Sequence, residues 1–248
     1  MHIPDYSLQN ITLFFTAIIG DGIVVLRELK PTTRLGYSKF ASNNNTIWKI
    51  PSRWGMLLIY MPSALLFLVL LTLSSAKGHV WITVLLNAFH YMKRIYEVLF
   101  LHKYSGSALI KDVLLISTCY AVHAMGLVYL TARVPVDHIV RKQVTFGATF
   151  FIVGEIMNHY HHRILAGLRK EKDDVPEQGL FPWLWCPHYL GEIIAFIAMG
   201  FVSQNGMTFV LQLGSAAYLA VRAHNTKAWY ESKFPHAATR AALIPGIL

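Results

Sequence analysis

Seven runs of apolar residues, separated by polar segments, restrict what this chain of 248 residues can fold into. A helix needs about 20 apolar residues to cross the hydrocarbon core of a membrane, or somewhat fewer if flanking side chains reach the interface. Runs two, three and four reach this length comfortably, whereas runs five, six and seven are short. The runs span residues 11–26, 55–75, 80–101, 113–132, 145–157, 190–203 and 207–221.

The composition favours a membrane protein over a soluble domain. Hydrophobic residues make up 54% of the chain and charged residues only 14%, whereas a soluble domain carries roughly a quarter charged residues. Wherever lipid surrounds the backbone, its polar groups have to be satisfied within the chain, which favours helices. The sequence therefore predicts an all-α integral membrane bundle of about seven transmembrane helices, formed by residues 1–248 as a single domain.

The basic residues lie between the runs, so the formal charge of +9 does not indicate a nucleic-acid partner. Basic loops stay on the cytoplasmic side of a membrane. The loops after runs one, three and five, and the tail, carry most lysines and arginines, whereas segments 76–79 and 204–206 are nearly neutral. Arg133, Arg141 and Lys142, after run four, are the exception. This pattern predicts an N-terminus away from the cytosol and a C-terminus in it.

The first run carries Gly20-Asp21-Gly22, which is not a dinucleotide fingerprint because the third glycine and a strand–helix unit are missing. We interpret it as a polar kink near a helix end. The run lacks a small-residue cleavage site and is expected to remain as a span. Cys119 and Cys186 lie far apart in or beside apolar segments, so no disulfide framework is expected.

The third run ends in polar residues that membrane interiors rarely hold. Tyr91 and Arg94 share one helical face, while His90, Lys93 and Glu97 share another. Lys93 and Arg94 could extend along the helix to the interface. Alternatively, Arg94 points at an anionic ligand while Tyr91 points into the bundle. Both interpretations stay open at this point.

The segment 157–192 holds the densest group of polar residues next to apolar runs. Such residues cost free energy unless they are paired or bind something. Asn158, His162, Leu165 and Arg169 are spaced four, three and four apart, which is one face of a helix. That face offers an amide, an imidazole and a guanidinium to one ligand. The neighbouring histidines do not have the several clusters of a membrane di-iron site, so no metal is expected.

Further candidates come from spacing in the remaining runs. Pro62 removes a backbone hydrogen bond inside run two and leaves a carbonyl free one turn earlier, either as a structural kink or as a cavity wall with Tyr60 and Ser63. Tyr189 and Glu192 lie about one turn apart, and Arg222 and Tyr230 about two turns apart. Tyr37, in the first polar loop, could reach a ligand with its ring and hydroxyl.

Taken in order, several motifs are similar to those of the steroid 5α-reductase family, whose relatives include the very-long-chain enoyl-CoA reductases. The resemblance covers nearly the whole chain and is strongest after Asn158. Combined matches in one order are more specific than any single motif. The matching positions are Asn158 with Ile164-Leu165 and Leu168-Arg169, Gly191-Glu192-Ile193, Arg222, Tyr230, segment 240–245, His90-Tyr91 with Arg94, and Tyr37.

The chain departs from the steroid-reductase pattern at three positions. It reads Ile59-Tyr60-Met61-Pro62-Ser63 where steroid reductases show Gln-Glu-Leu-Pro-Ser, so Tyr60 stands in place of an acidic substrate contact. His162 replaces an aspartate and His188 an asparagine. His162, the Cys186-Pro187 pair and the KR..E.LF.H.YS pattern of run three resemble the enoyl-CoA reductase branch instead. The resemblance therefore leaves the substrate open between a 3-oxo-Δ4 steroid and a long-chain trans-2-enoyl-CoA.

The resemblance implies an oxidoreductase that uses NADPH to reduce a carbon–carbon double bond conjugated to a carbonyl, with hydride added to the β-carbon and a proton to the α-carbon. Tyr91 is the expected hydrogen-bond donor to the carbonyl oxygen, with Tyr60 as the substitute for the missing acid. The cofactor is expected on the cytosolic side, mainly in the C-terminal part at about residues 145–248. Its expected contacts are Tyr37, Arg94, Asn158, His162, Arg169, His188, Glu192, Arg222 and Tyr230.

Two other functions remain as alternatives. The segment 186–192, CPHYLGE, also looks like the HP.Y.G segment shared by membrane sterol reductases and by isoprenylcysteine or phospholipid methyltransferases, which would imply S-adenosylmethionine. A non-catalytic membrane scaffold would instead tolerate alanine at Arg169 and Glu192. For the reductase, the expected partners are a lipid substrate and membrane lipid, in steroid metabolism or fatty acid elongation. The expected location is the endoplasmic reticulum of a eukaryote or the inner membrane of a bacterium.

Overall fold

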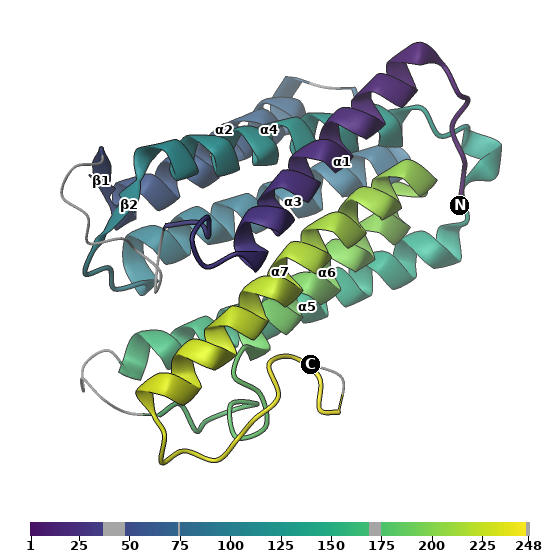
Figure 1. Cartoon of the computed structure of the whole chain (residues 1–248). Helices are drawn as coiled ribbons and strands as arrows, with labels where there is room; N and C mark the ends of the chain where they lie inside the picture. The colour runs from purple at the N-terminus through teal and green to yellow at the C-terminus, as the bar shows by residue number, and fades with distance from the viewer. Residues whose placement is uncertain (37–47, 74, 169–174, 247–248) are drawn as a thin grey trace.

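The computed structural model describes residues 1–36, 48–73, 75–168 and 175–246, and the chain in these ranges is almost entirely helical. Each of the seven apolar runs forms the core of one α-helix (Figure 1), which confirms the all-α prediction. A two-stranded antiparallel sheet of β1 (Lys49–Pro51) and β2 (Ser107–Leu109) is the only described sheet. The helices are α1 (Leu8–Leu29), α2 (Ser52–Leu73), α3 (Gly78–Tyr96), α4 (Ile110–Ala132), α5 (Arg141–Leu168), α6 (Pro187–Ser203) and α7 (Gly206–Lys233).

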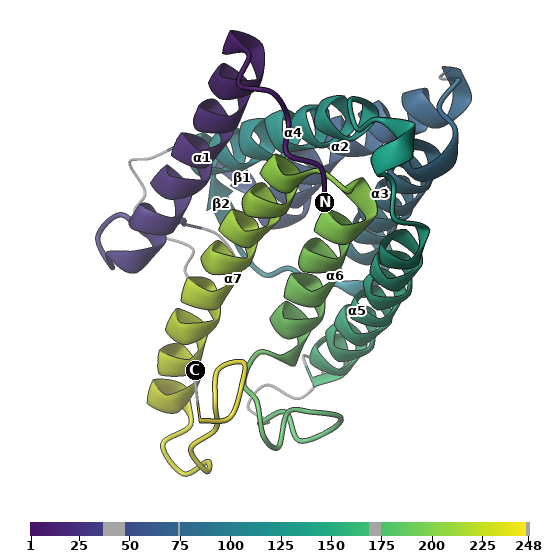
Figure 2. The same cartoon turned by 90° about the vertical axis from the view of Figure 1, so that its right-hand side faces the viewer.

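The helices form two groups that meet along the middle of the molecule. Helix α2 packs against α3 and α4, while α6 packs between α5 and α7. Helix α1 lies across the junction, in contact with both α4 and α7 (Figures 1 and 2). Residues from α2, α3 and α4 therefore face residues from α5, α6 and α7 across the interior.

Two glycines bring α5 and α6 into close contact. A Cβ atom added at Gly154 would lie 2.5 Å from the Gly191 carbonyl oxygen, and one added at Gly191 would lie 2.7 Å from the Asn158 nitrogen. Small residues of this kind let two helix backbones approach closely. The contact places Asn158 on α5 next to Glu192 on α6.

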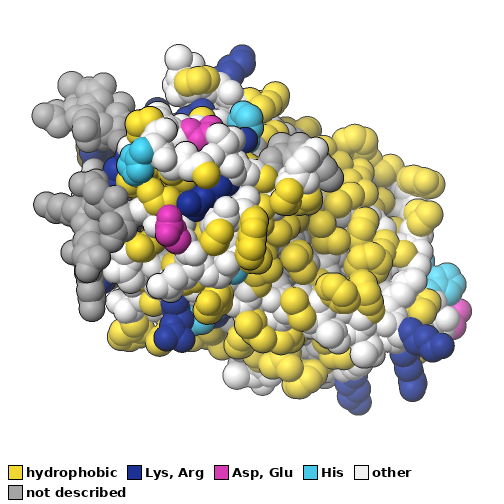
Figure 3. Space-filling view, turned by 90° about the horizontal axis from the view of Figure 1, so that it is seen from below, with side chains coloured by type: hydrophobic (Ala, Val, Ile, Leu, Met, Phe, Trp, Pro, Cys, Tyr) yellow, Lys and Arg dark blue, Asp and Glu magenta, His cyan; other side chains and the backbone are white. Residues whose placement is uncertain are grey.

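Three of the described helices are long and apolar enough to cross a membrane, namely α1, α2 and α4. The third run, expected to be of full length, is not among them, because α3 carries His90, Lys93 and Arg94 in its last two turns. Large apolar side chains such as Phe15, Leu65 and Leu114 are more than half exposed. Figure 3 shows a broad apolar area on one face, with the charged side chains gathered toward its ends. This surface suits a lipid surrounding better than water.

Helix α2 continues through Pro62, and a neighbouring helix satisfies the carbonyl that the proline leaves free. Proline lacks an N–H group, so the carbonyl four residues earlier loses its helical partner. That carbonyl belongs to Leu58, and it accepts a hydrogen bond of 2.8 Å from the Ser117 hydroxyl on α4. The predicted free carbonyl thus joins α2 to α4.

Helix α1 also runs through Gly20-Asp21-Gly22 without ending there, so the prediction of a nearby helix end was wrong. Apolar residues continue on both sides of the motif, and the chain leaves the helix only at Lys30. Asp21 consequently lies in the middle of a candidate membrane span.

Candidate active site

A cavity with an empty volume of about 1140 Å³, including its open mouth, lies where the two helix groups meet. Residues of α2, α3 and α4 line one side of it, and residues of α5, α6 and α7 line the other. Six of the residues expected to bind substrate or cofactor line this cavity: Tyr60, Arg94, His162, His188, Glu192 and Arg222. The structure therefore brings together residues that are up to 162 positions apart in the sequence, from Tyr60 to Arg222.

Arg94 turns into the bundle and does not extend to the surface. Its side chain is only 7% exposed, and its Nη2 donates a hydrogen bond of 2.7 Å to the Tyr60 hydroxyl oxygen. The guanidinium carbon lies 5.0 Å from the centre of the Tyr60 ring. Because the Tyr60 oxygen accepts from Arg94, the phenol hydrogen can point to another acceptor in the cavity.

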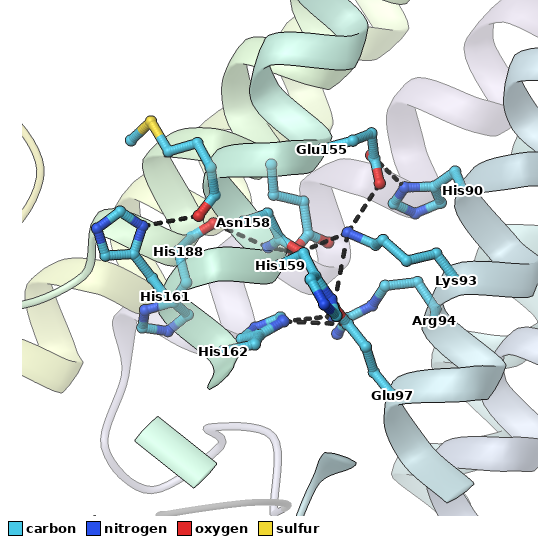
Figure 4. A network of polar contacts seen from close by, with 12 residues as sticks. His90, Lys93, Arg94, Glu97, Glu155, Asn158, His159, His161, His162 and His188 are labelled. Atoms are coloured by element: carbon cyan, nitrogen blue, oxygen red, sulfur yellow. Dashed lines mark hydrogen bonds and ion pairs between the residues drawn. The ribbon is translucent and has the colours of Figure 1, made fainter. Parts of the chain in front are cut away.

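Glu97 gathers the cationic and imidazole groups beside Arg94 (Figure 4). Its buried carboxylate accepts hydrogen bonds of 2.7 Å from Arg94 Nη1, 2.8 Å from His159 Nδ1 and 3.0 Å from His162 Nδ1. Lys93 Nζ lies 3.9 Å away. Burial lowers the pKa of His162, so this imidazole is neutral at pH 7 and has one N–H to donate. Glu97 thus fixes the orientation of both Arg94 and His162.

A π-helical turn, η2 (Glu97–Leu101), follows α3 and changes the direction of the next side chains. It closes with a 2.7 Å hydrogen bond from the His102 N–H to the Glu97 carbonyl. Turns of this kind often occur at functional sites, because the extra residue shifts the helical register. Here the shift places the His102 ring 4.7 Å from the His162 ring, in an edge-to-face arrangement.

Lys93 links the buried carboxylate of Glu155 to Asn158, which contacts the cavity wall. Its ammonium group lies 2.7 Å from Glu155 Oε2 and donates a 2.6 Å hydrogen bond to Asn158 Oδ1. His90 Nδ1 lies 2.7 Å from the other oxygen of Glu155. The Asn158 amide nitrogen in turn donates to Glu192 Oε2 at 3.2 Å. Asn158 therefore lies behind the cavity and orients Glu192 within it.

Glu97, His102 and His162 offer three metal-ligand atoms within 4.8 Å of one another. The same carboxylate, however, is already bound to Arg94 and lies near the Lys93 ammonium group. A divalent cation here would stand beside two fixed positive charges in a poorly solvated region. The arrangement favours a charge-balanced network over a metal site.

Arg222 reaches the cavity from α7 and is paired with a carboxylate of α1. Its Nη1 donates to both oxygens of Glu28, at 2.9 and 3.0 Å, and all of Glu28 is buried. Asn225, one turn further along α7, donates to the Glu28 backbone carbonyl at 2.8 Å. Glu28 was missed from the sequence, where it is an acid among the basic residues that follow the first run.

Three predicted site residues that the structure describes do not line the cavity. Tyr91 lies behind it, with its ring stacked on Phe67 at 5.7 Å and edge-on to Tyr120 at 6.2 Å. Tyr120 itself lines the cavity and stacks on Tyr60 at 5.9 Å, so aromatic contacts connect Tyr91 to Tyr60. Asn158 acts through its neighbours, as described above. The third residue is Tyr230.

Tyr230 belongs to a stack that holds the C-terminal tail. Its ring lies 4.8 Å from that of Trp185 and nearly parallel to it, with the Arg240 guanidinium on Trp185 at 4.5 Å. Arg240 also donates to the carbonyl oxygens of Pro176 and Phe181, at 2.6 and 2.7 Å. The remaining two predictions, Tyr37 and Arg169, lie outside the described residues.

Several cavity residues were not singled out from the sequence. Tyr120 and Tyr218 are aromatic residues within apolar runs, where a packing role is the usual interpretation. His102 and Tyr104 also line the cavity, and they are the histidine and the tyrosine of the H.YS part of the reductase-like pattern at the end of run three. That pattern was the available signal for them.

Comparison with known proteins points to one family. The sequence model of the family described as 3-oxo-5-alpha-steroid 4-dehydrogenase matches residues 110–248. The very-long-chain enoyl-CoA reductase of Dictyostelium discoideum is 28% identical over 170 residues, which cover 64% of this chain and 55% of that protein. Steroid 5-alpha-reductase DET2 of Gossypium hirsutum is 34% identical over 106 residues, which cover 41% of each. Polyprenal reductase 1 of Oryza sativa subsp. indica is 33% identical over 110 residues, which cover 40% of this chain and 30% of that protein. The chain thus spans about half or less of the length of these relatives.

Proposed function

Because the chain belongs to the 3-oxo-5-alpha-steroid 4-dehydrogenase family, we propose that it reduces a carbon–carbon double bond conjugated to a carbonyl in a lipid, with NADPH as the hydride donor. The lipid is a 3-oxo-Δ4 steroid or a long-chain trans-2-enoyl-CoA. The observation that carries this proposal is the Tyr60–Arg94 pair, held in the wall of the cavity by Glu97. The family match and the relatives named above are reductases, so the methyltransferase alternative is not favoured.

The chemistry of the cavity wall fits a phosphate-bearing cofactor. Arg94, Lys103 and Arg222 contribute positive charge, whereas Glu192 is the single carboxylate among the described lining residues. Guanidinium groups suit phosphates because their planar N–H groups bind two oxygens at once. In this proposal Arg222, His162, His188 and Glu192 hold NADPH, with Asn158 orienting Glu192. Tyr37, Arg169 and Tyr230 remain candidates for the same role. When bound, NADPH supplies the hydride that adds to the β-carbon.

Tyr60 is the proposed hydrogen-bond donor to the substrate carbonyl. As hydride adds to the β-carbon, negative charge develops on the carbonyl oxygen, and a fixed donor stabilises that charge without having to reorganise. Arg94 donates to the Tyr60 oxygen, which polarises the phenol toward giving its own hydrogen to the substrate. Tyr91 lies one aromatic contact further away and is proposed to position Tyr120 and Tyr60. Protonation of the α-carbon completes the reduction.

The test is an assay of the purified protein in detergent with NADPH and each candidate lipid. We expect NADPH oxidation with one lipid class and a product that has gained two hydrogen atoms by mass spectrometry. Heat-inactivated protein is the control. In parallel, NADPH should raise the melting temperature, because a ligand that binds only the folded state stabilises it. If S-adenosylmethionine raised it and NADPH did not, the methyltransferase would replace the reductase.

We also propose that all seven helices cross the membrane, with the N-terminus away from the cytosol. The basic loops after runs one, three and five support this orientation. Single cysteines introduced into a Cys119→Ala, Cys186→Ala background would report which segments a membrane-impermeant reagent labels in sealed vesicles. Labelling of segments 76–79 and 103–106 from the same side would contradict the arrangement.

A further inference from the structure

A second cavity, with an empty volume of about 490 Å³, lies between α1, α4, α6 and α7 and has no role in the reaction proposed above. Its wall is mainly apolar, formed by side chains such as Val24, Ile116 and Phe196. Four polar residues interrupt that wall: Asp21, Cys119, His123 and Ser215. Polar groups at membrane depth are rare, and they mark binding sites more often than packing positions.

Asp21 presents a carboxyl oxygen that the protein does not satisfy. Its Oδ2 is buried and has no hydrogen-bond partner among the described residues. On α7 the position that faces it is Gly214, where an added Cβ would lie 2.5 Å from that oxygen. The helix contact therefore has room for the carboxyl group only because residue 214 has no side chain. A buried polar atom without a partner costs free energy unless a ligand completes its hydrogen bonding.

His123 supplies a donor to the same cavity. The Gln212 amide nitrogen lies 3.1 Å from His123 Nε2. An amide N–H can only donate, so Nε2 accepts, and in the neutral imidazole the proton is then on Nδ1. Within the described parts of the chain that N–H has no partner. An oxygen atom placed in this cavity could accept from His123 and, as a hydroxyl, interact with Asp21.

The two cavities adjoin each other. Tyr120, Tyr218 and Leu219 line both of them. A lipid with its carbonyl at Tyr60 would extend past these three side chains to reach Asp21 and His123. If the methyl end of an acyl chain occupied the second cavity, it would offer no oxygen, and neither Asp21 nor His123 would gain a hydrogen-bond partner from the lipid.

We propose that the second cavity binds the end of the lipid substrate farthest from the reacting double bond, and that Asp21 and His123 recognise a hydroxyl or carbonyl oxygen there. This inference rests on the proposed reductase function and narrows its substrate to a lipid with oxygen at both ends. A site built around hydrogen bonds rejects an analogue that lacks the partner group, because its own polar groups then stay buried and unpaired.

The test compares two 3-oxo-Δ4 steroids that are identical except for a hydroxyl group on the ring farthest from the enone. With NADPH and the unaltered protein, kcat/KM should be about tenfold higher for the hydroxylated steroid. In Asp21→Leu and His123→Phe this ratio should fall toward one. Asp21→Asn keeps the size and hydrogen-bonding capacity of the side chain and should keep most of the ratio. Ile23→Ala, at a lipid-exposed position two residues from Asp21, should leave it unchanged.

Melting temperatures keep this inference separable from the reductase proposal. The hydroxylated steroid should raise the melting temperature of the unaltered protein more than its analogue does, and Asp21→Leu should lose that difference. If neither these steroids nor an enoyl-CoA is reduced while this difference persists, the reductase function fails and the binding site stands. Equal stabilisation by both steroids, or a kcat/KM ratio that survives both Asp21→Leu and His123→Phe, would overturn the inference. Melting temperatures without lipid show whether each variant has folded.

Discussion

At the scale of single residues, the two candidate tyrosines differ in what surrounds them. Tyr60 lines the cavity and accepts a hydrogen bond from Arg94, whereas Tyr91 is packed among Phe67, His90 and Tyr120. Both are tyrosines in apolar runs; Tyr91 belongs to the family-like HY..R motif, whereas Tyr60 stands where the family pattern has an acid. Their different surroundings depend on contacts between helices, which the sequence does not specify.

Tyr60→Phe should therefore reduce kcat more than Tyr91→Phe does. Removing one fixed donor to a developing oxyanion costs about 100- to 1000-fold in rate, while the loss of the Tyr91 hydroxyl only loosens the packing behind it. Steady-state kinetics on the lipid that is reduced would measure both variants. The rise in melting temperature with NADPH should persist in each. The opposite ranking, with Tyr91→Phe the more damaging change, would make Tyr91 the donor.

Glu97→Gln should destabilise the protein as well as slow it. The carboxylate is buried and holds Arg94, His159 and His162, and removing one partner of a buried ion pair costs about 3–5 kcal/mol. Glu231→Gln is the control, because Glu231 is 37% exposed and lies 4.0 Å from Lys227, and such pairs contribute about 0–1 kcal/mol. Thermal unfolding in detergent compares the two. Equal melting temperatures would mean that the Glu97 network does not support the fold.

At the scale of helices, the α5–α6 contact sets the position of Asn158 relative to Glu192. Gly154→Ala should push the helices apart, since its Cβ would lie 2.5 Å from the Gly191 carbonyl, and overpacking costs about 1–3 kcal/mol. Activity should fall as well, because the Asn158–Glu192 hydrogen bond spans this contact. Gly167→Ala, on the same helix, is the matched control, since a Cβ added there would meet nothing within 4 Å. An unchanged melting temperature for Gly154→Ala would show that α5 and α6 can move apart at this point without loss of stability.

The bond between Ser117 and Leu58 allows a double-mutant cycle on α2 and α4. Ser117→Ala leaves the Leu58 carbonyl without a partner, which should cost about 1 kcal/mol. In a Pro62→Ala background the residue 62 N–H can donate to that carbonyl, so the same change should cost much less. The unfolding midpoints of the four proteins give the coupling. Equal effects of Ser117→Ala in both backgrounds would mean that the serine does not compensate for the proline.

The positions of the helices were predictable from the sequence, while most of the pairing between them was not. Each apolar run marks a helix because hydrophobic burial and backbone hydrogen bonding act locally along the chain. Helix α5, however, continues eleven residues beyond run five to Leu168, because its polar side chains find partners on other helices. Lys93 shares a helical face with Glu97, four residues away, but lies closer to Glu155 on another helix. Such partners depend on the tertiary fold.

At the scale of the whole molecule, α3 and α5 join the two helix groups through charges. Lys93 and Arg94 come from α3, Glu97 from the turn that follows it, and Glu155 and His162 from α5. Two positive and two negative side chains balance one another in the interior. The cavity lies beside this junction, so stability and ligand binding depend on the same contacts.

Protonation of histidine should weaken the whole fold in mild acid. His161 donates from Nδ1 to the Met157 carbonyl at 2.7 Å and accepts from the Leu180 N–H at Nε2, at 3.1 Å. A second proton on the ring would face the Leu180 N–H and release the segment around Leu180. Burial lowers the pKa of His161 in the folded protein. As the pH falls below about 6.5, the ordinary histidine pKa, the unfolded chain therefore takes up the proton first and the free energy of unfolding decreases.

His161→Gln should reduce that acid sensitivity, at some loss of stability at neutral pH. The glutamine side chain does not titrate, so the variant loses one of the protons that the unfolded chain takes up in excess. His162, whose pKa burial also lowers, should account for part of the remaining slope. Denaturant unfolding at a series of pH values, from neutral to mildly acidic, measures the difference between the two proteins. Parallel curves for His161→Gln and the unaltered protein would mean that the segment stays docked when His161 is protonated.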